Sequence, residues 1–173
     1  MIRKVSALRA FYRFLLRRKL ATKNPAAELR TPKLKRKLPT FLAVEQANET
    51  TEMPTAVGGA VQHVRDRALL EVLYGSGVRV SELCGLDLNA VDLHAGVARV
   101  LGKGGKERLV PLGSQARAAL GEYLGVRHQL HDAKTQGQDP SALFLSARGE
   151  RLGVRQVQKL VKRYGMLATG TSV

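Results

Sequence analysis

The sequence contains little cysteine and no tryptophan, and its apolar runs are short. Cys84 is the single cysteine among 173 residues, so neither an internal disulfide nor a thiolate metal cluster can form. A small disulfide-stabilised secreted domain is therefore excluded. Lysines and arginines interrupt the apolar residues of segment 1–20, which makes it neither a signal-peptide core nor a membrane span. We expect a cytoplasmic protein that does not bind membranes.

Acidic residues are also scarce. The chain has 14 Asp and Glu against 29 Lys and Arg, a formal net charge of +15. Residues 1–40 hold thirteen of the basic residues and one acidic residue, Glu28, so this segment contributes a net +12. Such a density of positive charge attracts nucleic-acid phosphates by counterion release, with an affinity that falls as salt rises. A solvated charged face or a membrane-surface helix is the alternative that composition leaves open.

The balance of apolar (44%) and charged (25%) residues is that of a folded protein, and the length suits one domain, or one domain with part of another. Residues 5–19 have helical spacing, with Arg9, Arg13 and Arg17 at every fourth position on one face. We expect those arginines to contact phosphates. We expect the opposite, apolar face to pack; it comprises Val5, Leu8, Phe11, Tyr12, Leu15 and Leu16.

Two prolines and a basic stretch, which includes Lys35 and Arg36, predict an interdomain linker over about residues 31–40. After the linker, a short helix is expected around 44–50, followed by a loop rich in Pro and Gly. A clearer helix begins near Val64 and ends at Gly75 and Gly77. Later helices are expected from Arg79, from a capping Ser114, and over 154–164 with Val154, Val157, Leu160, Val161 and Tyr164 inward.

In residues 97–112 the spacing of apolar residues changes from the helical pattern to the alternation typical of a strand. Two alternating segments flank the glycine-rich residues 102–105, which predicts an antiparallel β-hairpin with Lys103 and Lys106 at its tip. A lysine there can enter a groove and deliver a proton, although a solvated turn residue is the more frequent case when the motif stands alone. The predicted fold is therefore mainly α with a small antiparallel β-sheet.

Arg79 occupies an unusual place for a cation. It follows a glycine turn at the expected start of a helix, where the positive end of the helix dipole disfavours it. A phosphate at the same place would reverse that penalty, because free backbone N–H groups and a guanidinium both bind phosphate oxygens. Glu82 could orient the guanidinium, and a simple Arg79–Glu82 surface pair is the alternative.

Metal ligands are few. His128 and His131 have helical spacing but no carboxylate or thiolate companion, so an exposed helical face is the better interpretation. We expect neither a metal nor another cofactor.

Two segments together resemble a known family. VRDRALLEVLYGSGVRVSELCGLDL (64–88) and the hairpin GKGGKERLVPLG (102–113) resemble the tyrosine recombinases of the phage integrase family, and within them the bacterial Xer recombinases, the XerC-like ones in particular. Segments 5–26 and 142–163 are also similar. The resemblance covers nearly the whole chain apart from residues 45–62 and the last few.

The resemblance implies a DNA strand-breaking and rejoining enzyme of the chromosome dimer resolution type. Residues 1–40 would be the C-terminal part of a helical core-binding domain with its linker, and residues 41–173 the N-terminal part of the catalytic domain. In this family a tyrosine attacks the scissile phosphate without a metal. Arg79 would be the first catalytic arginine, Lys103 the proton donor to the leaving 5′ oxygen, and Glu82 a supporting residue. The partners implied are double-stranded DNA and, for a full-length protein, a sister recombinase subunit in a tetrameric synapse.

Six basic residues are expected to contact the DNA: Arg9, Arg13, Arg17, Lys35, Arg36 and Lys106.

The sequence also departs from the family. No histidine has an arginine three residues later, so the His-x-x-Arg motif has no match, and Tyr164, on an apolar helix face, is expected in the core rather than as the nucleophile. Our hypothesis is truncation at both ends, by a frameshift or a misplaced start, and a chain that is inactive alone. A non-catalytic DNA-binding fragment or decoy is one alternative, and a basic RNA-binding or ribosome-associated protein is another.

Overall fold

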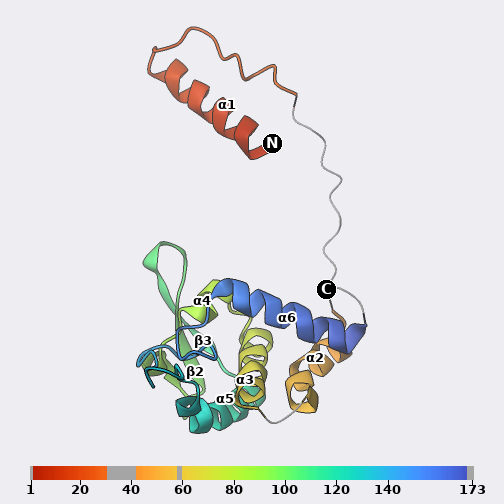
Figure 1. The fold of residues 1–173 in the computed structure, drawn as a ribbon. Helices are drawn as coiled ribbons and strands as arrows, with labels where there is room; N and C mark the ends of the chain where they lie inside the picture. The colour runs from red at the N-terminus through yellow and green to blue at the C-terminus, as the bar shows by residue number, and fades with distance from the viewer. Residues whose placement is uncertain (1, 31–41, 58–59, 171–173) are drawn as a thin grey trace. The chain divides into compact units, whose positions relative to one another are not determined.

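The computed structural model describes residues 2–30, 42–57 and 60–170. The chain divides into an N-terminal unit, Met1–Pro39, and a C-terminal unit, Thr40–Val173 (Figure 1). The predicted linker, with Lys35 and Arg36, lies outside the described residues.

The N-terminal unit consists of helix α1 (Ile2–Arg17) and the segment that follows it. Ala26 in that segment is buried, and the Arg9 Nε donates to the Ala26 carbonyl at 3.1 Å. Val5 on α1 is buried, but the apolar stripe as a whole is not: Phe11 is 54% exposed, and Leu8 and Leu16 are exposed as well. Tyr12 and Leu15 are half-buried, so the expected packing is wrong for Leu8, Phe11 and Leu16, because the short following segment covers only part of the helix.

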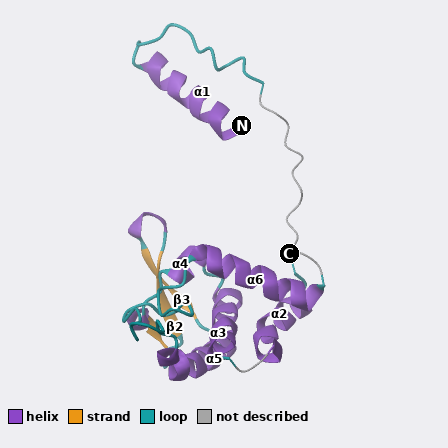
Figure 2. Cartoon of the chain, viewed as in Figure 1, coloured by secondary structure: helices purple, strands orange, loops and turns teal. Residues whose placement is uncertain are grey.

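Helices form most of the C-terminal unit (Figure 2). Helix α3 (Val61–Ser76) packs against α2 (Val44–Val57) and α5 (Ser114–Val126), and α6 (Val154–Thr169) packs against α2 (Figure 1). A five-residue helix, α4 (Val80–Cys84), contacts both α3 and α6. Three short 3₁₀ helices complete the helical elements: η1 (Leu88–Ala90), η2 (Lys103–Gly105) and η3 (Arg127–Gln129).

The sheet has three antiparallel strands in the order β1-β2-β3. Strands β2 (Val97–Leu101) and β3 (Glu107–Pro111) form the predicted hairpin, with Val97 opposite Pro111 and Leu101 opposite Glu107. Gly104 and Gly105 at its tip have positive φ values of 76° and 74°, which side chains other than glycine rarely adopt. Strand β1 (Val91–Asp92) was not predicted, because two residues are too few to show a period. The predicted class, mainly α with a small antiparallel sheet, is confirmed.

Helix ends show where local sequence signals succeed and fail. Gly77 ends α3 in the left-handed conformation (φ 61°) and donates its N–H to the Leu73 carbonyl at 3.1 Å, as expected. The loop expected after residue 50 is wrong, because α2 continues through Pro54 to Val57. Proline removes one helical hydrogen bond, and packing against α3 and α6 holds the helix together across it.

Two details of the later helices also differ from expectation. The N-cap of α5 is Gly113, and Ser114 is the first helical residue. Helix α6 extends past residue 164 to Thr169, and Val154 in its first turn is 37% exposed rather than inward. The other inward positions are buried or half-buried, and Tyr164 is fully buried, as expected.

Candidate phosphate-binding site at the start of α4

Arg79 is the N-cap residue of α4, and its side chain is 70% exposed. The flanking apolar residues Val78 and Leu83 are buried in the core at 6% and 1% exposure. Because the core holds the chain on both sides of it, Arg79 is fixed at the surface where a glycine turn ends and a helix begins.

Glu82 lies directly beneath Arg79. Its side chain is 4% exposed, and its Oε2 accepts the backbone N–H of Arg79 at 2.9 Å. Its Oε1 accepts the Arg79 Nη1 at 2.8 Å. The ion pair allowed by the helical spacing therefore forms, but its carboxylate is buried rather than at the surface.

A second arginine, Arg108 on β3, shares the same carboxylate. Its Nη1 donates to Oε1 of Glu82 and its Nη2 to Oε2, both at 2.8 Å. The forked bond from Arg108 and the N–H of Arg79 lower the pKa of Glu82 from 4.5 to about 2, against the opposing effect of burial. Glu82 is therefore a carboxylate at any pH above this range.

The far end of α4 is held by a third arginine. Arg151 Nη1 donates to the carbonyls of Cys84 at 3.2 Å and Leu86 at 3.1 Å, and its Nη2 pairs with Asp87. Carbonyl groups at a helix C-terminus have no partner within the helix, and Arg151 supplies a donor to that of Cys84. The Leu86 carbonyl also accepts the Leu143 N–H at 2.9 Å. Arg108 and Arg151 thus fix the two ends of the helix that carries Arg79.

The base of the hairpin lies next to Arg79. Arg79, Ser81, Glu82, Leu101 and Gly102 line an open hollow of about 430 Å³. Gly102 is so close that an added Cβ would lie 3.3 Å from Arg108 Nη1 and 3.8 Å from Glu82 Oε1. Lys103 follows Gly102 in the chain, and its side chain lies outside the described part of the structure.

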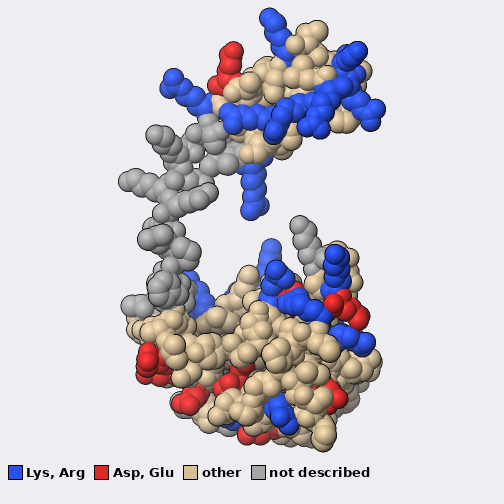
Figure 3. Space-filling view, turned by 180° about the vertical axis from the view of Figure 1, so that it is seen from behind, with Lys and Arg blue, Asp and Glu red and all other residues tan. Residues whose placement is uncertain are grey.

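Lys and Arg side chains crowd the N-terminal unit and gather at one edge of the visible face of the C-terminal unit (Figure 3). Lys106 in the hairpin is exposed. Helix α6, which contacts α4, exposes Arg155, Lys159, Lys162 and Arg163, as its spacing predicted. The C-terminal unit therefore carries cations on neighbouring elements around Arg79.

The arginines of α1 differ from one another. Arg9 is half-buried and donates to the carbonyls of Ala26 at 3.1 Å and Leu29 at 2.5 Å. Arg13 and Arg17 are exposed, and Arg13 Nε donates to the Arg9 carbonyl at 3.3 Å. Arg9 therefore has a structural role in its own unit that its spacing alone did not indicate.

Arg108 and Arg151 had no role assigned from the sequence. A signal for Arg108 was present: it lies two residues before the buried Val110, so the strand period directs it to the same inner face. An arginine on an inward face requires an acceptor. No comparable local signal marks Arg151, whose partners at α4, the Cys84 and Leu86 carbonyls, lie more than 60 residues earlier in the chain.

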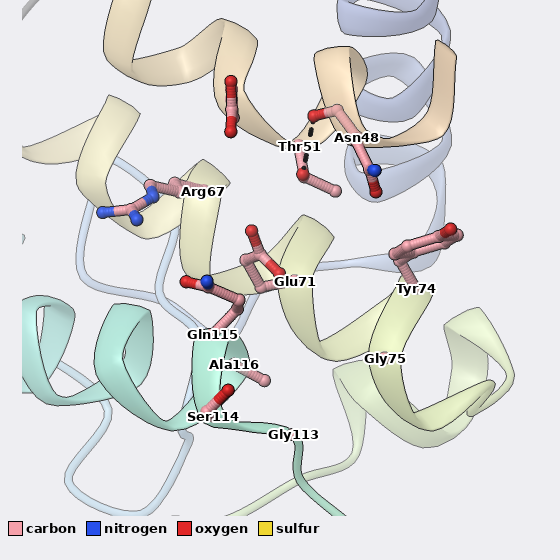
Figure 4. Close-up of a pocket in the computed structure, with 11 residues that line it drawn as sticks. Asn48, Thr51, Arg67, Glu71, Tyr74, Gly75, Gly113, Ser114, Gln115 and Ala116 are labelled. Atoms are coloured by element: carbon pink, nitrogen blue, oxygen red, sulfur yellow. Dashed lines mark hydrogen bonds between the residues drawn. The ribbon is translucent and has the colours of Figure 1, made fainter. Parts of the chain in front are cut away.

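A second hollow, of about 400 Å³, lies between α2, α3 and the start of α5 (Figure 4). Its lining includes the exposed Tyr74 and the half-buried Glu71 and Arg67, and Arg67 pairs with Glu122 at 2.9 Å. Because acidic residues offset its arginine, this hollow is less suited to a phosphate than the surface at Arg79.

Within residues 2–30, 42–57 and 60–170, no group of three or more His, Cys, Asp or Glu side chains could hold a metal ion. In the same ranges, no helix is long and apolar enough to span a membrane.

Comparison with known proteins places these features in a family. The model of the phage integrase family matches residues 41–172. Tyrosine recombinase XerC of Thermodesulfovibrio yellowstonii is 44% identical over 162 residues, which cover 94% of this chain and 53% of that protein. The XerC of Pelobacter propionicus is 46% identical over 92% of this chain and 50% of its own. The chain thus spans about half the length of these relatives.

Solved structures are similar as well. The XerA recombinase structure has a TM-score of 0.65 at 26% identity. The match covers 96% of this chain and 62% of that one. The XerH recombinase bound to palindromic difH substrate has a TM-score of 0.60 at 26% identity, over 76% of this chain and 37% of that one. A lambda integrase tetramer bound to a Holliday junction has a TM-score of 0.64 at 20% identity, over 98% of this chain and 47% of that one, which is a likeness of fold.

Proposed function

Because this chain belongs to the phage integrase family, with XerC tyrosine recombinases among its relatives, we propose that it binds duplex DNA and holds a backbone phosphate at Arg79. The observation that carries the proposal is the position of an exposed guanidinium at a helix start, beside the base of a glycine-tipped hairpin. Guanidinium groups favour phosphate oxygens because their parallel N–H groups can donate to two oxygens at once.

The charge of the surrounding surface supports this ligand. Arg13 and Arg17 on α1, Lys106 in the hairpin and the exposed basic face of α6 would contact further phosphates. We also propose that Lys35 and Arg36, because of their positive charge, contact phosphates. Among the similar solved structures, XerH is bound to palindromic difH substrate.

In the whole protein, we propose that Arg79 stabilises the negative charge that builds up on the phosphate as a tyrosine oxygen attacks phosphorus. The bond between phosphorus and the 5′ oxygen breaks, and the Lys103 ammonium gives its proton to that oxygen. The product is a phosphotyrosine at the 3′ end, formed without a metal or other cofactor. A second recombinase subunit in a tetrameric synapse would complete the strand exchange.

For this chain alone, we propose binding without cleavage. Tyr123 and Tyr164 are both fully buried, and the Tyr164 hydroxyl donates to Asp66 Oδ2 at 2.8 Å. Burial and this hydrogen bond raise the pKa of Tyr164, so its phenol stays protonated. The sequence offers no His-x-x-Arg motif to assist a nucleophile.

The decisive experiment combines binding and trapping. Incubation with nicked duplex DNA, followed by denaturing gel electrophoresis, should show no protein–DNA adduct; an adduct would refute the absence of cleavage. Gel shifts should show tighter binding to duplex DNA than to structured RNA of equal length. Preference for RNA would favour the alternative of an RNA-binding protein.

A further inference from the structure

Glu82 is a buried carboxylate that two arginines share. Arg79 approaches from the helix start and is 70% exposed, and Arg108 approaches from β3 and is 43% exposed. Arg108 contacts both carboxylate oxygens at 2.8 Å, the forked geometry that arginine and carboxylate favour. The guanidinium of Arg79 contacts Oε1 only, through Nη1, also at 2.8 Å.

The charges at this place do not cancel. Arg79 and Glu82 alone would form a neutral pair, and a neutral pair attracts a phosphate weakly. With Arg108 included, two positive charges face one negative charge, which leaves a net +1 beside the exposed guanidinium. Attraction between charges in contact is strong where burial reduces the screening by water, as it does at the 4% exposed Glu82.

The contacts also leave donors of Arg79 available. Within the described part of the chain, Nη1 is the only guanidinium nitrogen of Arg79 with a hydrogen-bond acceptor. Arg108 already donates to both oxygens of Glu82, and Arg79 donates only one guanidinium hydrogen bond to this carboxylate. Two nitrogens of Arg79 can therefore donate to a phosphate.

We propose that Arg108 is a positioning residue that offsets the charge of Glu82, so that Arg79 keeps the positive charge and the free donors needed to bind a DNA phosphate. The inference rests on the proposed function of Arg79. It assigns Arg108 no contact with DNA, and Arg108 acts through Glu82. The same ion pair joins β3 to α4, so it also holds the base of the Lys103 hairpin beside Arg79.

A double-mutant cycle on the full chain tests the proposal. Binding to a short fluorescent duplex is measured by anisotropy at fixed salt for wild type, Arg108→Gln, Glu82→Gln and the double variant. Gln at position 82 can still accept the Arg79 backbone N–H, as in other helix caps. We expect Arg108→Gln to weaken binding by about tenfold, the scale of one charge-assisted hydrogen bond, because Glu82 then offsets the positive charge of Arg79. The double variant should return to within about threefold of wild type, because it removes the negative charge of Glu82 together with the positive charge that offsets it, and such coupling is what the cycle detects.

A matched cycle in the same hairpin controls for net charge. Arg99 and Glu107 are 51% and 59% exposed and lie 3.9 Å apart. Arg99→Gln and Glu107→Gln change the total charge by the same amounts as the first pair. Their effects on binding should be small and additive. If Arg108→Gln weakens binding no more than Arg99→Gln does, the inference is wrong.

Arg79→Gln separates this inference from the proposed function. Binding of Arg79→Gln equal to that of Arg99→Gln would refute the phosphate site itself. Weak binding by Arg79→Gln together with an additive Arg108–Glu82 cycle would overturn only the role of Arg108.

If circular dichroism shows that Arg108→Gln does not fold, the proposal can still be tested with the two other variants. Glu82→Gln and the double variant should then bind within about threefold of each other, because Arg108 has no carboxylate left to offset. A tenfold difference between them would mean that Arg108 contacts DNA directly, which contradicts the proposal.

Discussion

At the scale of the residue, Tyr164 illustrates how a reactive side chain becomes structural. It is fully buried, and its hydroxyl donates to Asp66, whose other oxygen accepts two bonds from Arg65. Arg65 in turn donates to the Leu145 carbonyl at 2.8 Å. Its place in the core was expected from the helical spacing and is confirmed; the charged pair that receives its hydroxyl was not foreseen.

Replacement of Tyr164 by Phe should destabilise the protein and leave DNA binding unchanged. Removal of the hydroxyl leaves Asp66 Oδ2 without a partner, which costs about 1–3 kcal/mol for a buried acceptor. Urea unfolding measures the difference in free energy of unfolding. The control is Tyr74→Phe, at a 51% exposed position, which should change stability by less than about 0.5 kcal/mol. Equal effects of the two variants would contradict the buried network.

Glu82 makes stability depend on pH in acid. Its pKa is lowered from 4.5 to about 2, so the stabilisation from its ionised form is present above pH 4.5 and is lost as pH falls toward 2. We expect the free energy of unfolding of Glu82→Gln to fall less over this range than that of wild type. Unfolding in urea at several pH values measures it. Glu107→Gln, which removes a 59% exposed carboxylate, should follow the wild-type curve.

At the scale of the element, α4 shows that a very short helix can be a precise support. Five residues cannot form a stable helix by themselves. Val78 and Leu83 anchor the segment in the core, Glu82 caps its start, and Arg151 satisfies carbonyls at its end. The stability of α4 therefore comes from buried side chains and from hydrogen bonds at its two ends rather than from the helix propensity of five residues.

Arg151→Ala should weaken that support. Two carbonyls, of Cys84 and Leu86, lose a charged donor, and we expect a loss of about 1–3 kcal/mol in the free energy of unfolding. Arg148→Ala, at an exposed position in the preceding turn, should change stability by less than about 0.5 kcal/mol. If Arg151→Ala weakens stability but leaves α4 amides equally protected in hydrogen exchange, the role assigned to it here is incorrect.

At the scale of the whole molecule, the positive charge is distributed over both units. The N-terminal unit carries exposed arginines on α1, and the C-terminal unit carries exposed cations at Arg79, at Lys106 and along α6. Arg9 is the exception on α1, because it is bonded to the carbonyls of Ala26 and Leu29. Mutation should therefore distinguish the arginines that contact phosphates from Arg9, which stabilises its own unit.

Replacement of both Arg13 and Arg17 by Gln should weaken DNA binding and reduce the salt dependence. Removing one phosphate-binding cation lowers the slope of log affinity against log salt by about 0.9, so a reduction of about 2 is expected for the pair. Fluorescence anisotropy over a salt series measures it. Arg117→Gln with Arg148→Gln removes the same charge from exposed positions elsewhere. If that control flattens the slope equally, net charge rather than direct binding of phosphates explains the affinity.

Substitution of Lys103 should behave differently. Its proposed role is proton transfer rather than binding, so Lys103→Ala should bind duplex DNA within about threefold of wild type. A loss as large as that of the double Arg13 and Arg17 variant would show that Lys103 contributes mainly to binding.

The sequence by itself determined the elements with strong local signals. Three features could be predicted from the sequence alone. They are the helical stripe of α3 with Gly77 at its end, the hairpin with its glycine tip, and the excess of positive charge. Each depends on residues close together in the chain, where periodicity and backbone freedom act directly. Prediction from the sequence failed at Pro54 within α2, where packing outweighs a local signal, and at Leu8 and Phe11 on α1, which lack the cover that their spacing predicted.

Only the tertiary structure decided which charges meet. Arg108 reaches Glu82 across 26 residues of sequence, and Arg151 reaches Cys84 across 67. The spacing of residues along a chain cannot indicate such partners, because they are brought together by the packing of a strand and a loop against a helix. A buried carboxylate is stable only with its cations present, so the packing that buries Glu82 is also what requires Arg108 beside it.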